Sequence, residues 1–392
     1  MRKRLRIYVV MEPRTRYERG VYQGLTDYFT EKVPYFELII VFHQSAIDKT
    51  RSLKGIITLL TQPKEADSFL SFGVPVVNIS GYLESSKLPT VISDNEMSGR
   101  MAAEYLINCR FPHFGYHDHT PGHSFAMRGE GFKNAIARGG FPCSQHQPYK
   151  DVLSDFKELD VAQHRNLRKW ISGLPKPVGI FSGSDQDAWE VWNVCQELDL
   201  KIGKDVGIIG HGNDEFYCET RHPYLSSVEI QPDRIGYETG ALLLHLIRGG
   251  RPPSQAILVP PSGVVARESA NVFLAEDSYV DMAIQFIRTH LEETSLIQQV
   301  FAHVPMTRRT LERRFNQCLN RTIIETIHEL KIEHIKQLLD TTSMRLHEIA
   351  KASGFSNIYY MTRLFGKKVG LSPSKYRARF QRRTGTHSRR KK

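Results

Sequence analysis

Two short segments in the last third of the chain gather basic and hydrogen-bonding side chains at helical spacing. Arginine and lysine neutralise phosphates, arginine can donate two hydrogen bonds to guanine, and asparagine can form a matching pair with adenine. The chemistry that these side chains offer is therefore the recognition of a nucleic acid. The residues that we expect to contact DNA are Thr307, Arg308, Arg309, Thr310, Arg313, Ser356, Asn357, Tyr360, Arg363 and Lys367.

A pair of short helices joined by a tight turn must position each segment. In residues 346–365, Gly354 ends the first helix, because glycine adopts the left-handed conformation that such a turn needs. Ser356 is expected to cap the second helix by accepting a bond from a backbone N–H. Residues 296–315 repeat this plan, but Pro305 stands in the turn and cannot adopt a positive φ. Both segments are therefore predicted to be helix-turn-helix units whose turns differ in detail.

The second unit carries an extended sequence signature. The run IA–ASGF–S–YYMTRLFGKKVG–SPSKYR resembles that of AraC/XylS-type transcription regulators. Met361 stands where the family usually has phenylalanine, Gly366 where it often has lysine or arginine, and Pro305 where it prefers glycine. The alternative interpretation is a solvated basic face on an ordinary helical bundle.

The resemblance implies an all-α DNA-binding domain over residues 278–383. Its helix-turn-helix motifs would span about 295–316 and about 344–367, and their second helices would enter successive major grooves. Members of this family more often activate transcription than repress it, so the resemblance favours an activator.

The positive charge of the chain is concentrated in the same region. Residues 278–392 hold about 22 Lys+Arg and 9 Asp+Glu, and the rest of the chain holds about 31 and 33, out of totals of 53 and 42. The whole formal excess of +11 therefore lies in the last third, which is an electrostatic footprint for phosphates. Residues 384–392 are predicted to be a disordered basic tail that adds nonspecific phosphate affinity.

Residues 1–267 alternate short apolar runs with amphipathic ones, which predicts parallel β-sheets with helical crossovers. Strands are expected at 6–10, 36–42, 53–60, 74–79, 91–93, 114–118, 178–182 and 206–210, and helices at 17–32, 97–109, 124–138, 185–198 and 230–247. These are too many strands for one small sheet, so two lobes are predicted. The predicted fold class is a two-lobed α/β domain of parallel, doubly wound sheets followed by an all-α domain.

Four segments of this half resemble landmarks of the LacI/periplasmic-binding-protein effector fold. In chain order they are SDNEMSGRMAAEYLINCRFPHFGYH, MRGEGFKNAI, IFSGSDQDAWEV and VGIIGHGNDE. The resemblance implies an effector domain over residues 1–267, with a ligand cleft between its lobes and a small sugar such as xylose as the effector. Residues 268–277 would be a linker. Because the sequence starts directly at its first predicted strand, the N-terminal helix-turn-helix of LacI-type repressors is not expected.

Six residues are candidates for contacting the effector: Arg128, Asp185, Asn213, Asp214, Asp94 and Tyr17. Arg128, in MRGEGF, matches the position where the resemblance places an effector-binding arginine, whose fork of donors suits vicinal hydroxyls or a carboxylate. Asp185 follows a predicted strand, at the edge where clefts of α/β sheets lie, and its alternative role is a helix N-cap. The family places an aspartate where this chain has Gly212, so Asn213 or Asp214 is expected to substitute.

The run 113–123 contains four histidines and invites a metal-site interpretation. His117 and His119 would share one face of a strand. A lone H-x-H pattern is weak, however, and the sequence identifies no second cluster, so we predict strand-end and loop histidines rather than ligands. The five scattered cysteines include no CxxC pattern, which favours neither a disulfide framework nor a zinc finger. No metal, no cofactor and no catalytic residue is predicted.

The sequence as a whole predicts a sugar-controlled, DNA-binding transcription regulator and not an enzyme. The expected partners are double-stranded promoter or operator DNA, a small sugar effector, a second copy of the chain in a homodimer, and RNA polymerase. No apolar run reaches transmembrane length and the N-terminal one is too short for a signal peptide, so no membrane association and a cytoplasmic location are expected.

Two alternatives belong to other classes of protein. The first is a carbohydrate-binding or carbohydrate-processing α/β protein with a basic domain that binds nucleic acids nonspecifically. It should show a clustered acid–base or nucleophile set, and the sequence offers none. The second is a transport-type binding protein, which would need a signal peptide and no DNA-binding half.

Overall fold

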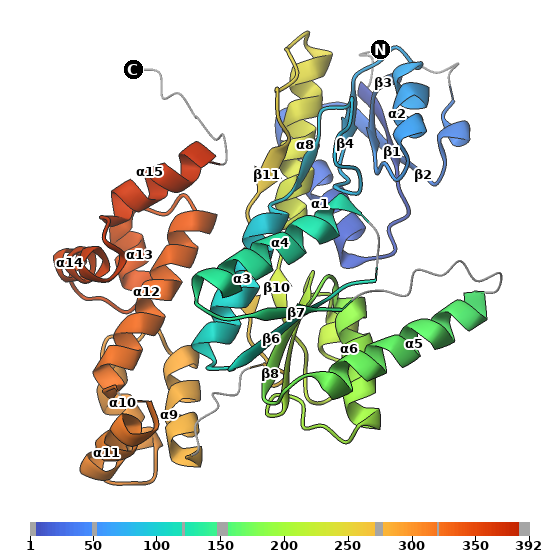
Figure 1. Cartoon of the computed structure of the whole chain (residues 1–392). Coiled ribbons are helices and arrows are strands. Elements are labelled where there is room, and N and C mark those ends of the chain that lie inside the picture. The colour runs from blue at the N-terminus through green and yellow to red at the C-terminus, as the bar shows by residue number, and fades with distance from the viewer. Residues whose placement is uncertain are drawn as a thin grey trace. The chain divides into compact units, whose positions relative to one another are not determined.

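The computed structural model describes residues 5–48, 53–119, 122–146, 156–270, 277–319 and 321–383. The chain divides into two compact units (Figure 1). Met1–Ile107 and Pro112–Ala270 form the first unit, and Asn108–Phe111 and Asn271–Lys392 form the second. The first unit mixes strands and helices and the second is helical, so the predicted fold class is confirmed.

The first lobe of the α/β unit is a parallel sheet with strand order β2-β1-β3-β4. Strands β5 and β11 pair in parallel beside it, and a bridge between Asn78 and Thr90 joins the two sheets. The elements of this lobe are β1 (Leu5–Val10), α1 (Arg16–Lys32), β2 (Phe36–Val41), β3 (Leu53–Thr58), α2 (Pro63–Leu70), β4 (Val76–Asn78), β5 (Val91–Ser93), α8 (Pro232–Ile247) and β11 (Ile257–Val259).

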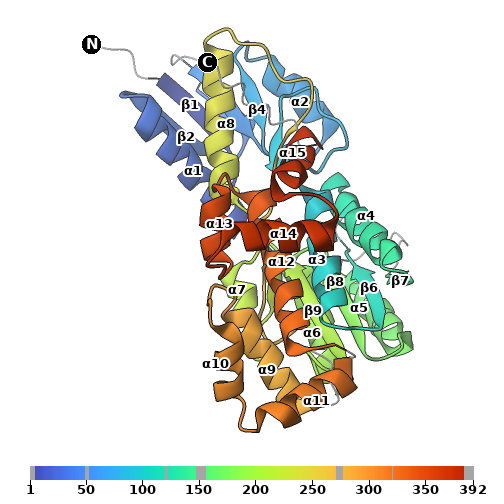
Figure 2. The same ribbon diagram turned by 90° about the vertical axis from the view of Figure 1, so that its left-hand side faces the viewer.

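Both faces of this sheet are buried. On β1, Ile7 packs in a core with residues of α1 and α8, whereas its neighbour Tyr8 packs in a second core with residues of α2. Successive strand side chains point to opposite faces, so a continuous apolar run fills both cores. Helices α1 and α8 lie side by side (Figure 2) and approach closely: a Cβ on Gly236 would meet the carbonyl oxygen of Val21 at 2.0 Å.

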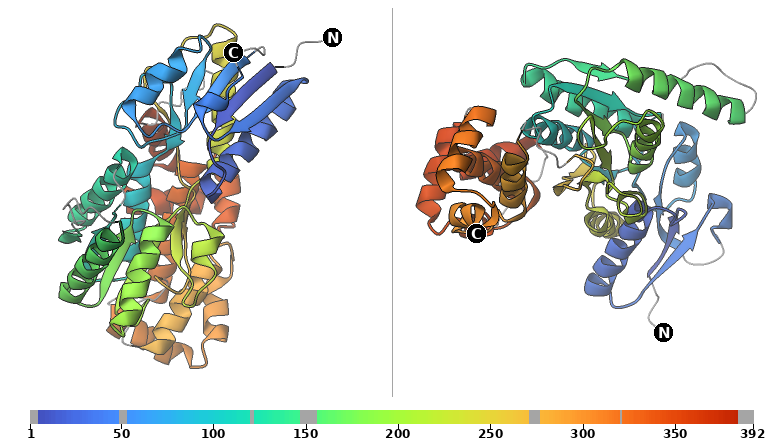
Figure 3. Two further views of the ribbon diagram at one scale, coloured as in Figure 1. Left: turned by 90° about the vertical axis from the view of Figure 1, so that its right-hand side faces the viewer. Right: turned by 90° about the horizontal axis from the view of Figure 1, so that it is seen from below.

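The second lobe has the strand order β12-β10-β9-β8-β6-β7, parallel except for the antiparallel pair β10–β12. Residue Gly115 of β6 faces Trp170 of α5, and the next residue, Tyr116, faces Gly129 of α4, so helices cover both faces. Helices α5 and α6 lie side by side (Figure 3). The elements are α3 (Asn95–Asn108), β6 (His113–His117), α4 (His123–Arg138), β7 (Cys143–Gln145), α5 (Phe156–Gly173), β8 (Val178–Ser182), α6 (Asp185–Glu197), β9 (Val206–His211), α7 (Glu215–Cys218), β10 (Ser226–Glu229) and β12 (Gly263–Val265).

The chain crosses between the lobes at residues 93–95, 229–232 and 259–263, where β5 leads into α3, β10 into α8 and β11 into β12. These short crossings lie beside the carboxyl ends of the parallel strands. In α/β proteins that edge is where ligands bind.

The second unit contains α9 (Ser278–Thr289), α10 (Leu296–His303), α11 (Arg308–Leu319), α12 (Ile323–Thr341), α13 (Leu346–Ala352), α14 (Ile358–Val369) and α15 (Pro373–Arg383). Two apolar cores share the long helix α12. Its Ile323 and Ile327 pack with α9, α10 and α11, and its Ile332 and Ile335 pack with α13 and α14. Helices α11 and α14 therefore lie toward opposite ends of α12 (Figure 2).

The first unit extends three residues beyond the expected boundary at residue 267. The hydroxyl of the buried Ser269 donates to the carbonyl of Ile208 at 2.6 Å and accepts from the amide of Ser226 at 2.8 Å. Residues 268–270 are thus part of the α/β unit and not of a linker. Of the rest of the expected linker, residues 271–276 lie outside the described residues, as does the expected tail, 384–392. Asp277 caps α9, since its carboxylate accepts from the amide of Tyr279 at 3.0 Å. Among the described helices, none combines the length and apolar character of a membrane span.

Candidate ligand cleft and nucleic-acid interface

A cleft of about 430 Å³ lies between the two lobes of the α/β unit. Its walls combine aromatic and aliphatic side chains with many polar and charged ones, a make-up that suits a polar small molecule. The lining residues are Thr15, Arg16, Tyr17, Glu18, Leu59, Ile79, Ser80, Gly81, Tyr82, Ile92, Ser93, Asn95, Ser124, Phe125, Arg128, Ser184, Asp185, Gln186, His211, Gly212, Asp214, Tyr217 and Ile230.

Arg128 of α4 presents its guanidinium to this cleft. Its Nε donates to Oδ1 of Asn95 at 2.8 Å, its Nη1 donates to the carbonyl of Gly183, and the group lies 4.6 Å from the centre of the Phe125 ring. Burial lowers the pKa of Arg128, but arginine stays charged at any physiological pH. A guanidinium has five N–H groups, so several remain for the oxygens of a ligand.

Asp185 is the first residue of α6, and Ser184 is the N-cap, since the Ser184 hydroxyl accepts from the amide of Asp187 at 3.0 Å. The carboxylate of Asp185 accepts from the Ser227 hydroxyl at 2.5 Å and from the amide of Asp214 at 2.8 Å. Burial raises its pKa to about 6. The N-cap alternative for Asp185 is therefore wrong, and a held carboxylate faces the cleft.

Two glycines make room for this carboxylate at the end of β9. A Cβ on Gly210 would lie 2.2 Å from Oδ1 of Asp185, and one on Gly212 would lie 3.2 Å from Oδ2. Gly212 also has φ +124°, which L-residues rarely adopt. The aspartate that the resemblance led us to look for at this position would therefore be strained.

The other four candidates divide into two pairs. Tyr17 and Asp214 line the cleft, and the Tyr17 hydroxyl donates to the carbonyl of Ile79 at 2.6 Å. Asp94 and Asn213 do not line it. The Asp94 carboxylate accepts from the amide of Met97 at 2.9 Å at the start of α3.

Asn213 is held by its neighbours in the second lobe. Its side-chain amide donates to Glu229 and its carbonyl accepts from Arg267 at 2.8 Å. Its backbone is left-handed, with φ +53°, and its amide donates to the Ser227 hydroxyl at 3.0 Å. These bonds shape the loop after β9 and leave Asp214 to face the cleft.

Two lining residues were not expected from the sequence. His211 ends β9, is buried, and places Nε2 at 3.2 Å from the Ser98 hydroxyl. Burial and the charge of Arg128 hold its pKa well below the usual range, so it is a neutral imidazole. Arg16 begins α1 in the first lobe and forms an ion pair with Glu229 at 2.7 Å. Arg16 lies outside the four landmark segments, and His211 lies inside VGIIGHGNDE, but the partners that place both side chains at the cleft come from distant parts of the chain.

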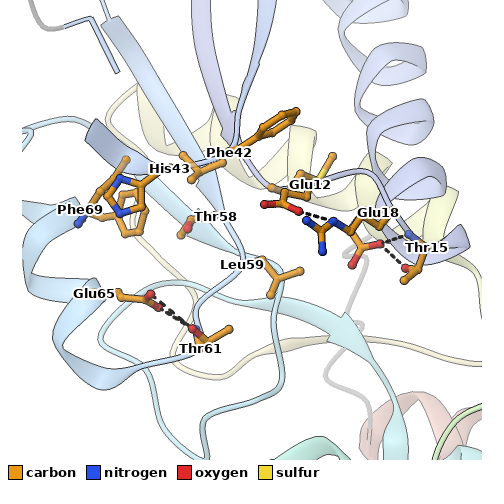
Figure 4. A pocket seen from close by; sticks show the side chains of 14 residues that line it. Glu12, Thr15, Glu18, Phe42, His43, Thr58, Leu59, Thr61, Glu65 and Phe69 are labelled. Atoms are coloured by element: carbon orange, nitrogen blue, oxygen red, sulfur yellow. Dashed lines mark hydrogen bonds and ion pairs between the residues drawn. The ribbon is translucent and has the colours of Figure 1, made fainter. Parts of the chain in front are cut away.

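A second pocket, of about 370 Å³, opens within the first lobe (Figure 4). It is lined by three glutamates, but each carboxylate already bonds to a residue close to it in the sequence. Glu18 accepts from Thr15, Glu65 accepts from Thr61, and Glu12 pairs with Arg14. The cleft between the lobes, with free donors on a buried arginine, is therefore the better candidate for a ligand site.

In the second unit, α11 exposes a basic face. Arg309 and Arg313 are exposed and form no ion pair with the described residues. Arg308 pairs with Glu312 at 2.9 Å and lies over the Phe301 ring at 4.9 Å. The free guanidiniums best placed for phosphate or base contacts are those of Arg309 and Arg313.

Thr307 and Thr310 stand at the start of α11. Their hydroxyls lie 2.8 Å apart, and the amide of Thr310 donates to the Thr307 hydroxyl at 3.4 Å. Thr307 therefore stands at the capping position of α11, and both hydroxyls lie near the exposed start of the helix.

At the start of α14 the cap is Asn357 and not Ser356. Its Oδ1 accepts from the amides of Tyr359 and Tyr360 at 2.7 and 3.3 Å. Asparagine, like serine, has a side-chain oxygen that can cap a helix, so the cap lies one residue later than predicted and α14 begins at Ile358. Ser356 is exposed, and Asn357 retains only its amide N–H groups for a base edge.

The two tyrosines of α14 differ in exposure. Tyr359 is 82% exposed, whereas Tyr360 is 42% exposed and places its hydroxyl 3.2 Å from Nε2 of His328. Arg363 lies 5.8 Å from the Tyr360 ring, and Lys367 is exposed one turn further on. Tyr359, which our sequence-based list omitted, is thus the more accessible aromatic residue.

The turn between α13 and α14 has the predicted left-handed glycine, since Gly354 has φ +65°. It is also crowded: Lys331 of α12 is 4% exposed and donates to the carbonyls of Gly354 at 2.8 Å and of Glu293 at 2.9 Å. Burial lowers the pKa of Lys331 to about 8. Lys331 thus ties the turn of the second motif to the loop before α10.

The turn of the first motif is different, as Pro305 predicted. The amide of Met306 donates to the carbonyl of Val304 at 2.7 Å, and no residue of the turn from 304 to 307 has a positive φ. Extended backbone replaces the left-handed residue here.

Comparisons with known proteins cover both units. A family described as a periplasmic binding protein-like domain matches residues 103–270, and one described as a helix-turn-helix domain matches residues 301–379. The chain is 25% identical over 372 residues to the xylose operon regulatory protein of Haemophilus influenzae, covering 92% of this chain and 95% of that protein. It is 27% identical over 386 residues to the protein of the same name from Escherichia coli, covering 96% and 97%.

A solved structure of the xylose-binding transcription activator XylR is similar over nearly the full length. The TM-score is 0.60 at 25% identity, covering 96% of this chain and 98% of that chain. The similarity therefore extends over the α/β unit and the helical unit together.

Proposed function

We propose that this chain, which is a transcription regulator joining a periplasmic-binding-protein-like effector domain to an AraC-type helix-turn-helix domain, binds a small sugar such as D-xylose in its interlobe cleft. Sugar binding would control how α11 and α14 engage duplex DNA. The observation that carries the proposal is the pair of Arg128 and Asp185 in one cleft.

This pair suits a polyhydroxylated ligand. A sugar hydroxyl both donates and accepts, so it can receive an N–H of Arg128 and donate to the carboxylate of Asp185. Both groups are held by other residues, Arg128 by Asn95 and Gly183 and Asp185 by Ser227. They are therefore preorganised, and the cost of ordering them on binding is low. The rings of Tyr82 and Phe125, which also line the cleft, offer apolar faces to the C–H groups of a sugar.

The DNA-binding half follows from charge and exposure. Arg309 and Arg313 of α11 and Tyr359, Arg363 and Lys367 of α14 are exposed on the two recognition helices. Two such helices would enter major-groove segments about one helical turn apart, roughly 34 Å along the duplex. The xylose regulators that this chain resembles support promoter or operator DNA as the target.

Three further features are part of the proposal. The chain would act as a homodimer, so that lobe closure changes the spacing of two DNA-binding domains. It would act as an activator that contacts RNA polymerase, in the cytoplasm where the DNA is. No catalytic step is proposed for any residue.

The proposal is tested by a thermal-shift screen of monosaccharides on the full chain, with L-xylose as the matched control for D-xylose. A sugar at 100 times its dissociation constant adds about 2.7 kcal/mol to the free energy of unfolding of the state that binds it. We expect D-xylose or another aldose to raise the melting temperature and L-xylose not to. If no sugar in the screen shifts the melting temperature, the cleft does not bind a sugar.

A further inference from the structure

Four side chains of the second lobe converge on one point beside the cleft. His117 ends β6, His119 follows two residues later, and Asp187 and Glu190 lie one turn apart on α6. One nitrogen or oxygen from each side chain lies within 4.8 Å of the others. We propose that these four residues form a site for a divalent first-row transition metal, with Zn²⁺ as the best fit.

The spacing of the donor atoms matches such a site. His119 Nδ1 lies 2.7 Å from Asp187 Oδ1 and 3.2 Å from Glu190 Oε2, and His117 Nε2 lies 3.8 Å from the same Glu190 oxygen. In a tetrahedral zinc site with bonds of about 2.0–2.1 Å, neighbouring ligand atoms are about 3.3–3.4 Å apart. The observed separations lie on either side of that value, so small side-chain adjustments would complete the tetrahedron.

The buried atoms at the centre of the cluster lack other partners. His117 is 1% exposed and Asp187 is fully buried. Within the described part of the chain, His117 Nε2 and Asp187 Oδ1 are buried and have no hydrogen-bond partner outside the four-residue cluster. Buried polar atoms are nearly always satisfied in proteins. A bound cation would supply one partner to both of these atoms at once.

A second layer of contacts orients the ligands. His117 Nδ1 lies 3.0 Å from Nδ1 of His146, and the other oxygen of Asp187, Oδ2, accepts from the Ser184 hydroxyl at 2.8 Å. When His117 carries its proton on Nδ1, its Nε2 keeps a lone pair that points into the cluster. Hydrogen bonds of this kind fix the tautomer and direction of metal-binding histidines and carboxylates.

The donor set selects the class of metal. Two imidazoles and two carboxylates without a thiolate suit Zn²⁺ and related first-row ions, whereas Mg²⁺ and Ca²⁺ prefer sites made entirely of oxygen. The sequence-based interpretation rejected a metal site because the H-x-H pattern stood alone. The two carboxylates that complete the set come about 70 residues later, and only the fold brings them to His117 and His119.

The site would brace one wall of the cleft. The amide of Gly183 donates to the carbonyl of His117 at 2.8 Å, and the carbonyl of Gly183 accepts from Arg128. Helix α6, which carries Asp187 and Glu190, begins with Asp185 in the cleft. A metal would thus fix β6, the β8–α6 loop and the start of α6 to one another.

The test is calorimetry of ZnCl₂ binding to the full chain after its metal has been removed with a chelator. The cluster is removed by the double variant His119→Gln, Glu190→Gln. The matched control is His164→Gln, Glu197→Gln, which breaks an exposed histidine–glutamate pair at 2.9 Å on α5 and α6. We expect one tight zinc ion per wild-type chain, an affinity at least 100-fold weaker in the cluster variant, and wild-type affinity in the control.

Co²⁺ gives a second readout, since four-coordinate Co²⁺ absorbs strongly in the visible and the hydrated ion does not. If the double variant does not fold by circular dichroism, Glu190→Gln alone supplies the comparison, because Glu190 is partly exposed. Either of two results would overturn the proposal: a wild-type chain that takes up no tight equivalent of zinc, or a folded cluster variant that binds zinc as tightly as the control.

Discussion

The backbone amide of Arg16 lies 3.1 Å from Oδ2 of Asp214, although 198 residues separate the two in the chain. Arg16 begins the first helix of the first lobe, and Asp214 follows β9 of the second lobe. The guanidinium of Arg16 reinforces this contact by donating to the carbonyl of Gly212 at 2.9 Å. Both residues line the cleft, so they form a latch between the lobes. A ligand that favours the closed arrangement would act through this latch.

Replacing Arg16 with alanine should therefore weaken sugar binding. The ion pair with Glu229 is partly exposed, so we expect a loss of about threefold to tenfold, equivalent to about 0.6–1.4 kcal/mol. The loss should appear mainly as faster sugar dissociation. Calorimetry measures the affinity, and stopped-flow fluorescence measures the rate. Arg14→Ala is the control, because the exposed Arg14 side chain pairs, among the described residues, with the neighbouring Glu12 alone. Equal effects of the two variants would show that the latch has no role.

Arg128→Ala should weaken the binding of the sugar found in the screen at least about tenfold. Each lost hydrogen bond to a charged group costs about 1.5–3 kcal/mol, and about 1.4 kcal/mol is a factor of ten. Arg138→Ala, at the end of the same helix, is the control, because the Arg138 side chain is exposed and, within the described part of the chain, donates only to the carbonyl of Asn134. Calorimetry on both variants decides the matter, and an Arg128→Ala chain with wild-type affinity would place the effector elsewhere.

Asp185 should make stability depend on pH. Burial raises its pKa to about 6 from an ordinary value of about 3.8, so the folded state binds more protons than the unfolded state between these two values. The contribution of Asp185 to the free energy of unfolding is then fully present below about pH 4 and declines by about 1.4 kcal/mol per pH unit up to about pH 6.

Thermal unfolding of the wild type and of Asp185→Asn from pH 4 to pH 7 measures this effect. The melting temperature of the wild type should fall relative to that of the variant up to about pH 6, and the difference should then stay constant. Two melting curves that run parallel over the whole range would contradict the assignment.

Gly354 is expected to be sensitive for two reasons. Alanine there would be strained at φ +65°, and its Cβ would lie 2.4 Å from Nζ of Lys331 and 2.6 Å from the carbonyl of Glu293. Gly370 has a similar φ of +78° but open space around its Cβ. Comparing Gly354→Ala with Gly370→Ala therefore separates strain from crowding.

The strain alone costs about 1–2 kcal/mol in either variant. We expect Gly354→Ala to weaken DNA binding well beyond Gly370→Ala, because it displaces Lys331 and the start of α14, and to leave sugar affinity unchanged. Electrophoretic mobility shift titrations and calorimetry measure the two affinities. If both variants bind DNA equally well, the crowding around Gly354 does not position α14.

The sequence pattern correctly predicted those elements whose conformation depends mainly on residues close together in the chain. The apolar runs of β1, β8 and β9 and the left-handed glycine at 354 were predicted from neighbouring residues alone. Strand β10 was not, because its sequence SSVE looks like a loop. Its buried Ser226 and Ser227 are satisfied by Arg267 and Asp185, partners about 40 residues away.

The same limit applies to the candidate sites. Arg128, Asp185 and Asp214 were predicted from the landmark segments, and Tyr17 was a candidate outside them; all four line the cleft. Arg16 was not predicted, because its contacts with the second lobe leave no local signal in the sequence. The cap of α14 was predicted at Ser356 and lies at Asn357. Both side chains can cap a helix, and the sequence does not show which of the two the backbone places at the helix start. Asp94 and Asn213 carry polar groups that could bind a sugar, but they do not line the cleft. Asp94 accepts from the backbone amide of Met97, and Asn213 bonds to Ser227 in the loop after β9.

The most direct test of the account is the effect of the sugar on DNA binding by the full chain. A duplex selected from a random pool by the wild-type chain is labelled, and its affinity is measured by fluorescence anisotropy with and without saturating sugar. Coupling between two sites is typically about 1–3 kcal/mol, or about 5- to 150-fold. We predict a change of at least about fivefold for the wild type and none for Arg128→Ala, which should still bind the duplex. A sugar that binds the wild-type chain tightly but leaves its affinity for the duplex unchanged would contradict the account.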